Sequence, residues 1–152
     1  MNARTLLHLV LALAAALGMS LVALPAKAAD GIGERCESFR GAKRCAFWSL
    51  DGGSGDDQVP YATTTVNVNN GGDAEVKTAM MQRRTQSGWV TVARSNGSGV
   101  RGYYASDSAA VARCGDLKKG TYRSRGKVSW SSEGVRYKRW ITGTPVKKRA
   151  LC

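Results

Sequence analysis

The sequence predicts an all-β sandwich that is held by two disulfides and lacks catalytic machinery. Short runs of alternating apolar and polar residues recur between glycine- and serine-rich turns, which is the spacing of two-sheet β proteins. Four cysteines form an even set in a small chain, as in exported proteins with disulfides. The only histidine is His8, so residues 29–152 hold no imidazole for a catalytic triad or a histidine-ligated metal.

Residues 1–28 have the pattern of a secretion signal peptide. Arg4 gives a positive start, an apolar run covers residues 6–24, and small residues at 25–28 provide a cleavage site. An uncleaved membrane anchor is the alternative, and the Ala-x-Ala site favours cleavage over it. We therefore expect a secreted, extracellular chain from residue 29, with no stable membrane insertion after the signal is removed.

The cysteines predict two disulfides within one domain. Of the three pairings we favour Cys36–Cys45 and Cys114–Cys152, since the first closes a short local loop and the second ties the last residue to the domain. A zinc site is the alternative, but the chain has no Cys-x-x-Cys knuckle. We expect no metal and no cofactor.

Residues 29–45 are predicted to form an amino-terminal segment with a disulfide loop. Residues 29–35 are glycine-rich and aperiodic, which indicates a short flexible lead-in. The ring closed by the first bridge would be preorganised for binding a partner. The alternative is that this bridge only staples the amino-terminal strand. The candidate partner-binding residues are Arg35, Phe39, Arg40, Lys43 and Arg44.

Residues 46–152 are predicted to form the β-sandwich domain. The acidic stretch 51–57 departs from EF-hand spacing and indicates a solvated turn rather than a calcium site. Residues 106–113 contain three alanines and could form helical turns instead of strand. The strand-like runs are 45–50, 63–69, 75–82, 89–94, 100–105, 109–114, 121–130, 135–141 and 146–152.

One short passage makes the sandwich prediction more specific. The run Leu117-Lys-Lys-Gly-Thr-Tyr122, followed by an alternating strand, resembles the tyrosine corner of immunoglobulin-like sandwiches. The resemblance implies that the Tyr122 hydroxyl bonds back across the corner, although the cysteine placement departs from the immunoglobulin pattern. The tryptophans at strand positions are expected in the core rather than on a binding surface; they are Trp48, Trp89, Trp130 and Trp140.

Charge is unevenly distributed along the chain. Residues 30–75 carry net −4 and residues 76–152 carry net +14. In the second part, alternation gathers cations on one face of two neighbouring strands, and this face favours an anionic partner unless it is only a solvated surface. It lacks a base-stacking motif, so nucleic acid is not favoured. The residues of this predicted basic face are Arg123, Arg125, Lys127, Arg136 and Lys138.

Enzymatic activity is not expected from this sequence. Only Asp107, Asp116 and Glu133 remain as acids after residue 75, in no paired arrangement suited to glycoside hydrolysis. The chain has no nucleophile elbow, no phosphate loop and no dinucleotide fingerprint.

The layout of the chain resembles a known family. A leader, a glycine-rich lead-in, a basic segment near the start and a compact β domain are similar to the small adaptor subunit of the umbrella toxin particles secreted by Streptomyces. The resemblance implies that the amino-terminal segment enters the cleft of a trypsin-like lectin subunit, while the β domain sits on a large repeat-containing subunit. The candidates for entering the cleft are then Arg35, Arg40, Lys43 and Arg44.

The expected function is thus a secreted non-catalytic adaptor that joins subunits of an extracellular toxin complex. Two alternatives stay open. One is a protease inhibitor that presents Arg40, Lys43 or Arg44 on the disulfide-held loop. The other is a binder of cell-envelope polyanions through the basic face.

Overall fold

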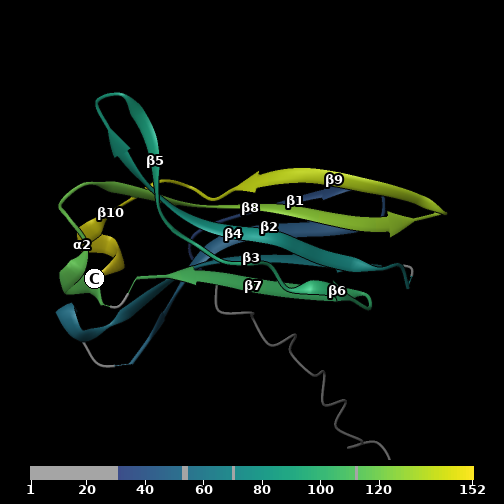
Figure 1. Cartoon of the computed structure of the whole chain (residues 1–152), viewed down its shortest axis with the longest axis horizontal. Helices are drawn as coiled ribbons and strands as arrows, with labels where there is room; N and C mark the ends of the chain where they lie inside the picture. The colour runs from purple at the N-terminus through teal and green to yellow at the C-terminus, as the bar shows by residue number, and fades with distance from the viewer. Residues whose placement is uncertain (1–30, 53–54, 70, 112) are drawn as a thin grey trace, which may run out of the picture.

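Two antiparallel sheets pack face to face in the computed structural model, which describes residues 31–52, 55–69, 71–111 and 113–152 (Figure 1). Sheet A has the order β1 (Ile32–Phe39), β2 (Ala42–Asp51), β3 (Val59–Val68) and β7 (Tyr104–Ala110). Sheet B has the order β10 (Val146–Lys147), β8 (Thr121–Ser132), β4 (Ala74–Thr85) and β5 (Gly88–Arg94). In addition, β9 (Val135–Thr142) pairs with β8, and β6 (Gly99–Arg101) pairs with β4. The predicted all-β sandwich is confirmed.

Short helical elements close the ends of the strands. They are η1 (Gly55–Asp57), η2 (Cys114–Asp116) and α2 (Lys148–Leu151). None of the helices in the described part of the chain is long and apolar enough to cross a membrane. The predicted signal peptide, residues 1–28, lies outside the described residues.

The strand order is that of an immunoglobulin-like sandwich. Strands β2, β3 and β7 take the places of A, B and E, while β9, β8, β4 and β5 take those of G, F, C and C′. Strand β1 adds one more strand beside A. Tyr122 begins the F-like strand β8, is buried, and donates its hydroxyl to the Lys118 carbonyl at 2.7 Å. The predicted tyrosine corner is therefore present.

Alternation along β8 and its neighbours fills the space between the sheets. One core cluster is built around Val66, Val76, Val128 and Trp130. The other contains Trp48, Met81, Tyr122 and Leu151. Inward residues of both sheets thus supply the core, while the alternate residues of β8 point away from it.

The predicted Cys114–Cys152 bridge is present, with a Cα–Cα distance of 5.7 Å. It closes the end of the sandwich where α2 buries Leu151 in the second core cluster. The strand expected over 146–152 is shorter than predicted, because β10 ends at Lys147 and the chain turns into α2.

The amino-terminal segment differs from the predicted flexible lead-in. From Ile32 onward it is a strand paired with β2, and Cys36 lies directly opposite Cys45 in the bridge that was predicted. Gly33 has φ 63° at a register shift, and a Cβ there would lie 2.7 Å from the Thr144 carbonyl oxygen. The glycine thus serves a bulge and a close approach, not mobility. The bridge staples this strand to the sheet.

The strand expected at 100–105 is divided between β6 and the start of β7, and β7 also covers residues for which helical turns were the alternative. Strand β7 ends at Ala110, before the end of the run expected at 109–114. It continues through Ser106-Asp107-Ser108 because it pairs along β3 over its whole length. The Ser108 hydroxyl lies 2.9 Å from that of Thr63, which lies 3.1 Å from that of Ser49. These hydroxyls form a neutral row across the outer face of sheet A.

Candidate anion-binding site

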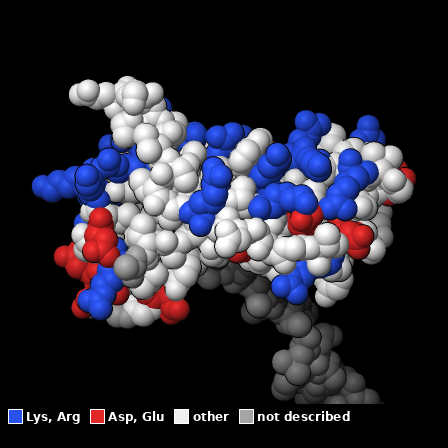
Figure 2. All heavy atoms as spheres, viewed as in Figure 1, with Lys and Arg blue, Asp and Glu red and all other residues white. Residues whose placement is uncertain are grey.

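The outer face of sheet B carries a concentration of cations. Arg123, Arg125 and Lys127 point outward from β8, while Tyr122 and the other alternate residues are buried against sheet A. Figure 2 shows Lys and Arg side chains along the upper part of the view, where Figure 1 places β8 and β9. The sequence predicted this face from period-two alternation, and the observed pairing of β8 with β9 assembles it.

The first cluster on this face surrounds Trp89 at the start of β5. The Arg123 guanidinium lies over the Trp89 ring, with Cζ 4.2 Å from the centroid, and Arg84 Cζ lies at 5.6 Å. Arg123 Nε also donates to Gln82 Oε1 at 2.9 Å. Stacking and this hydrogen bond together fix the orientation of Arg123.

The second cluster surrounds Trp140 in β9. Lys127 and Trp140 are cross-strand partners, and Lys127 Nζ lies 5.7 Å from the ring centroid. Arg125 Cζ lies closer, at 4.3 Å. Trp140 is 42% exposed. Each of these cations therefore rests on an aromatic surface instead of extending freely into solvent.

The core prediction for the four tryptophans is correct for two of them. Trp48 and Trp130 are buried. Trp89 and Trp140 lie on the outer face of sheet B, since strand alternation places them on the same side as the cations. The outward position of Trp140 was predictable from the sequence, because Trp140 lies two residues after Lys138 and so on the same face of the strand. The remaining residues of the two clusters, Arg84 and Gln82, had no sequence signal of their own.

The cations of the two clusters are not paired with carboxylates in the described part of the chain. Among the residues that the structure describes, none of the ion pairs involves Arg84, Arg123, Arg125 or Lys127. Partial burial lowers the pKa of Arg123, and the nearby charges of Arg125 and Arg84 lower it further. The guanidinium groups thus repel one another, and an anionic ligand would relieve this repulsion.

Arg136, predicted as part of the basic face, lies on this outer face, and its charge is paired with an acid. Its Nη2 donates to Glu75 Oε2 at 2.7 Å, and Ser129 donates to the same oxygen at 3.0 Å. Burial opposes the charged form of Glu75, but hydrogen bonds and charges from Lys77, Ser129 and Arg136 more than offset it and lower its pKa. Arg136 therefore stabilises the sheet, whereas Lys138 stays exposed beside it.

Strands β1 and β2 form a hairpin, and two of its predicted partner-binding residues are restrained by ion pairs with Glu37. Arg44 is only 4% exposed, lies 3.2 Å from Glu37 and packs over Trp130, so it is not available to enter a partner cleft. Burial lowers its pKa, and Glu37 opposes that effect. Arg35 is exposed and lies 3.2 Å from Glu37 as well.

Lys43 is exposed, but its backbone pairs with strands on both sides. It lies opposite Ser38 in β1 and Asn67 in β3. A substrate-like loop needs an unpaired, extended backbone to fit a protease cleft. The position of Lys43 does not provide one.

The tip of this hairpin, residues 39–42 between β1 and β2, carries the remaining two candidates, Phe39 and Arg40. Phe39 is 37% exposed and lies beneath the guanidinium groups of Arg40 and Arg139, at 5.8 and 5.1 Å. Arg40 has φ 46°, and its carbonyl accepts a hydrogen bond from Trp130 Nε1 at 3.1 Å. Asn69 also donates its backbone N–H to the Gly41 carbonyl at 2.8 Å. The tip is therefore held rigidly against the sandwich.

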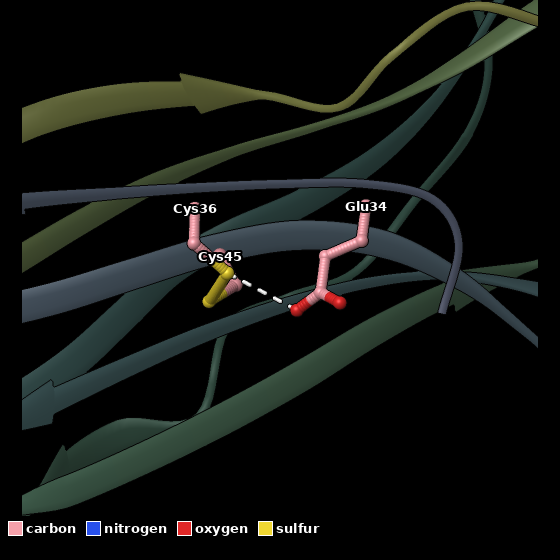
Figure 3. Close-up of side chains that lie close together, drawn as sticks. All are labelled: Glu34, Cys36 and Cys45. Atoms are coloured by element: carbon pink, nitrogen blue, oxygen red, sulfur yellow. Dashed lines mark hydrogen bonds between the residues drawn. A yellow bond between two sulfur atoms is a disulfide. The ribbon is translucent and has the colours of Figure 1, made fainter. Parts of the chain in front are cut away.

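One group of potential metal ligands occurs among the described residues. Glu34 Oε1 lies 3.1 Å from Cys36 Sγ, and Cys45 Sγ lies beside them (Figure 3). Both sulfurs belong to the disulfide, so neither is a thiolate that could bind a metal or carries a proton to donate. In the acidic turn, Asp57 is paired with Arg113 at 3.3 Å.

No protein-family model, no curated protein and no solved structure matches this chain. The two cation–aromatic clusters are thus the main basis for assigning a function.

Proposed function

We propose that this protein is a secreted, non-catalytic binding protein that holds an anionic polymer of the cell envelope against the outer face of sheet B. The carrying observation is the pair of clusters around Trp89 and Trp140, whose cations have no carboxylate partner among the described residues. The leader pattern of residues 1–28 supports secretion. Two disulfides support folding in an oxidising compartment.

An extended ligand fits this face better than a small ion does. Arg123, Arg125 and Lys127 occupy successive outward positions along one strand, so their charges form a line. Each cation that neutralises one charge of a polymer releases counterions and makes binding sensitive to salt. Loss of all three contacts should reduce the slope of log affinity against log salt by about two.

The test uses the triple variant R123Q/R125Q/K127Q. Wild type and variant are compared for retention on purified cell walls, both intact and after extraction of the anionic polymers, over a range of salt concentrations. We expect wild type to bind intact walls with a steep salt dependence and to lose binding on extracted walls. The variant should bind weakly to both.

A matched control removes the same charge from other exposed positions, as in K43Q/K118Q/K119Q. This control should retain most of the binding, because its substitutions lie outside the two clusters. Equal loss in both triple variants would show that only net charge matters. Unchanged binding in R123Q/R125Q/K127Q would overturn the proposal.

An adaptor function is a second proposal, and the rigid hairpin tip favours it. An adaptor needs two surfaces, and Phe39 with Arg40 and Arg139 provides one apart from the Trp89 and Trp140 clusters. Exposed aromatic and arginine side chains are typical centres of protein interfaces. Partners of the kinds implied by the toxin-particle resemblance are a trypsin-like lectin subunit and a large repeat-containing subunit.

Affinity purification of the tagged protein from its native culture supernatant, at low and high salt, tests the adaptor proposal. We expect wild type to retain two such proteins at both salt concentrations. The variant F39A/R40A should not retain them. Recovery of a single protease would favour the inhibitor alternative instead. That alternative has less support, since Arg44 is buried and Lys43 lies inside paired strands.

A further inference from the structure

We infer that the polymer bound by the outer face of sheet B is a phosphodiester chain without bases, such as a polyol phosphate, lying along β8. This inference rests on the proposed function and specifies its ligand. It follows from three features of the face, which are the spacing of its cations, the way its guanidinium groups are held, and the occupation of its aromatic rings.

The cations of β8 are evenly spaced. Outward side chains recur every second residue, so Arg123, Arg125 and Lys127 are separated by roughly 7 Å along the strand. Arg123 of the Trp89 cluster and Lys127 of the Trp140 cluster are accordingly about 13 Å apart along the strand, with Arg125 between them. A chain with one short polyol unit between successive phosphates presents its charges at a similar interval, so each phosphate can meet one cation.

The guanidinium groups are oriented for phosphate. Arg123 donates Nε to Gln82, and no other hydrogen bond of this guanidinium occurs within the described ranges, so both Nη groups are left to donate. Arg125 is likewise held by stacking on Trp140. A planar guanidinium fixed in this way matches the oxygen geometry of a phosphate in a two-point contact, which an ammonium group cannot do.

The aromatic rings of the face already support cations. The Trp89 ring is covered by Arg84 and Arg123, and the Trp140 ring by Arg125 and Lys127. Proteins that bind single-stranded nucleic acid stack bases on open aromatic rings. On the ring faces that carry these cations, a base could stack only by displacing one of them. Recognition through the charged backbone of the ligand avoids this competition.

The test measures the affinity of the full mature protein for three probes that carry the same number of charges at one ionic strength. The probes are a poly(glycerol phosphate) chain, an oligo-dT and a heparin oligosaccharide. We expect poly(glycerol phosphate) to bind about tenfold more tightly than the other two, since it alone combines the charge interval with a backbone free of stacking groups.

The variant R123K/R125K keeps the charge but removes both guanidinium forks. It should lose about tenfold in affinity for poly(glycerol phosphate) while its salt dependence stays unchanged. The matched control R101K/R149K makes the same exchange away from β8 and should bind as wild type does. Equal affinity of R123K/R125K and wild type would overturn the role of the forks.

The results separate this inference from the proposed function. Equal or tighter binding of oligo-dT or heparin, abolished in R123Q/R125Q/K127Q, would overturn the phosphodiester assignment and leave the polyanion-binding face in place. Failure of all three probes to bind at low salt, or equal binding by wild type and R123Q/R125Q/K127Q, would overturn both.

Discussion

Replacing Gly126 with alanine should overpack the space between the two sheets. Gly126 lies in the middle of β8 and faces Thr64 of β3. A Cβ at this position would overlap Thr64 Oγ1 and Cγ2 and would lie 2.6 Å from Thr64 Cβ. Thr64 is fully buried and β-branched, so rotating its side chain only exchanges one close atom for the other.

The size of the effect follows from these contacts. Real Cβ atoms essentially never approach other atoms closer than 3.0 Å, so Thr64 or one sheet must shift by roughly 1 Å. Overpacking of this kind costs about 1 to 3 kcal/mol, and we expect about 3 kcal/mol because the neighbour cannot move aside. This is a large part of the stability of a single domain.

The assay is urea unfolding of the oxidised protein followed by tryptophan fluorescence. Thr64→Ala removes the two closest atoms but keeps Cβ, which would still lie 2.6 Å from the new methyl group, so it relieves only part of the overlap. The double variant T64A/G126A should therefore be more stable than the sum of the two single effects predicts, by about 1 kcal/mol. Gly102→Ala is the control, since a Cβ there meets nothing within 4 Å. Stability of G126A within about 0.5 kcal/mol of wild type, or strict additivity in T64A/G126A, would refute the contact.

Three further predictions concern the fold. Alanine at both Cys114 and Cys152 should lower the free energy of unfolding by about 4 kcal/mol, because that bridge spans a sequence separation of 38; an unchanged urea midpoint would contradict this. Tyr122→Phe removes the bond to the Lys118 carbonyl and should cost about 1 kcal/mol in thermal unfolding, and a melting temperature equal to wild type would show that the corner is dispensable. Despite the opposing effect of burial, hydrogen bonds and cations hold the pKa of Glu75 below its ordinary 4.5. The ionised carboxylate therefore contributes to the free energy of unfolding fully above pH 4.5, and this contribution is lost as pH falls through the native-state pKa. The urea midpoints of wild type and E75Q should then converge in acid. A difference between the midpoints that stays constant with pH would contradict this assignment.

Strand alternation made the outer face of sheet B predictable, while long-range contacts did not show in the sequence. Period two placed Arg123, Arg125 and Lys127 on one side of β8 before any pairing was known. Arg136 has the same local pattern, and only the distant Glu75 distinguishes it as a structural residue. A local pattern gives the direction of a side chain but not its partner.

The amino-terminal strand illustrates the same limit. Glycine at residue 33 looks like a sign of mobility when only its neighbours along the chain are considered. Its role depends on the carbonyl of Thr144, more than a hundred residues away in the sequence. The bridge between Cys36 and Cys45 was predictable because it is local, yet its place between paired strands required the register of β1 against β2.

The two outer faces of this sandwich are unlike, and this determines how the protein settles on a charged boundary. The outer side of sheet B carries cations, whereas the centre of sheet A carries a row of hydroxyls from Ser49, Thr63 and Ser108, of which that of Thr63 is buried between the other two. If the protein is held on an anionic wall by the outer face of sheet B, as proposed, the row of hydroxyls at the centre of sheet A would be turned away from the wall. That row carries no charge to attract the cations of a second molecule. The asymmetry of the two faces would therefore favour a single layer of bound protein over stacked layers.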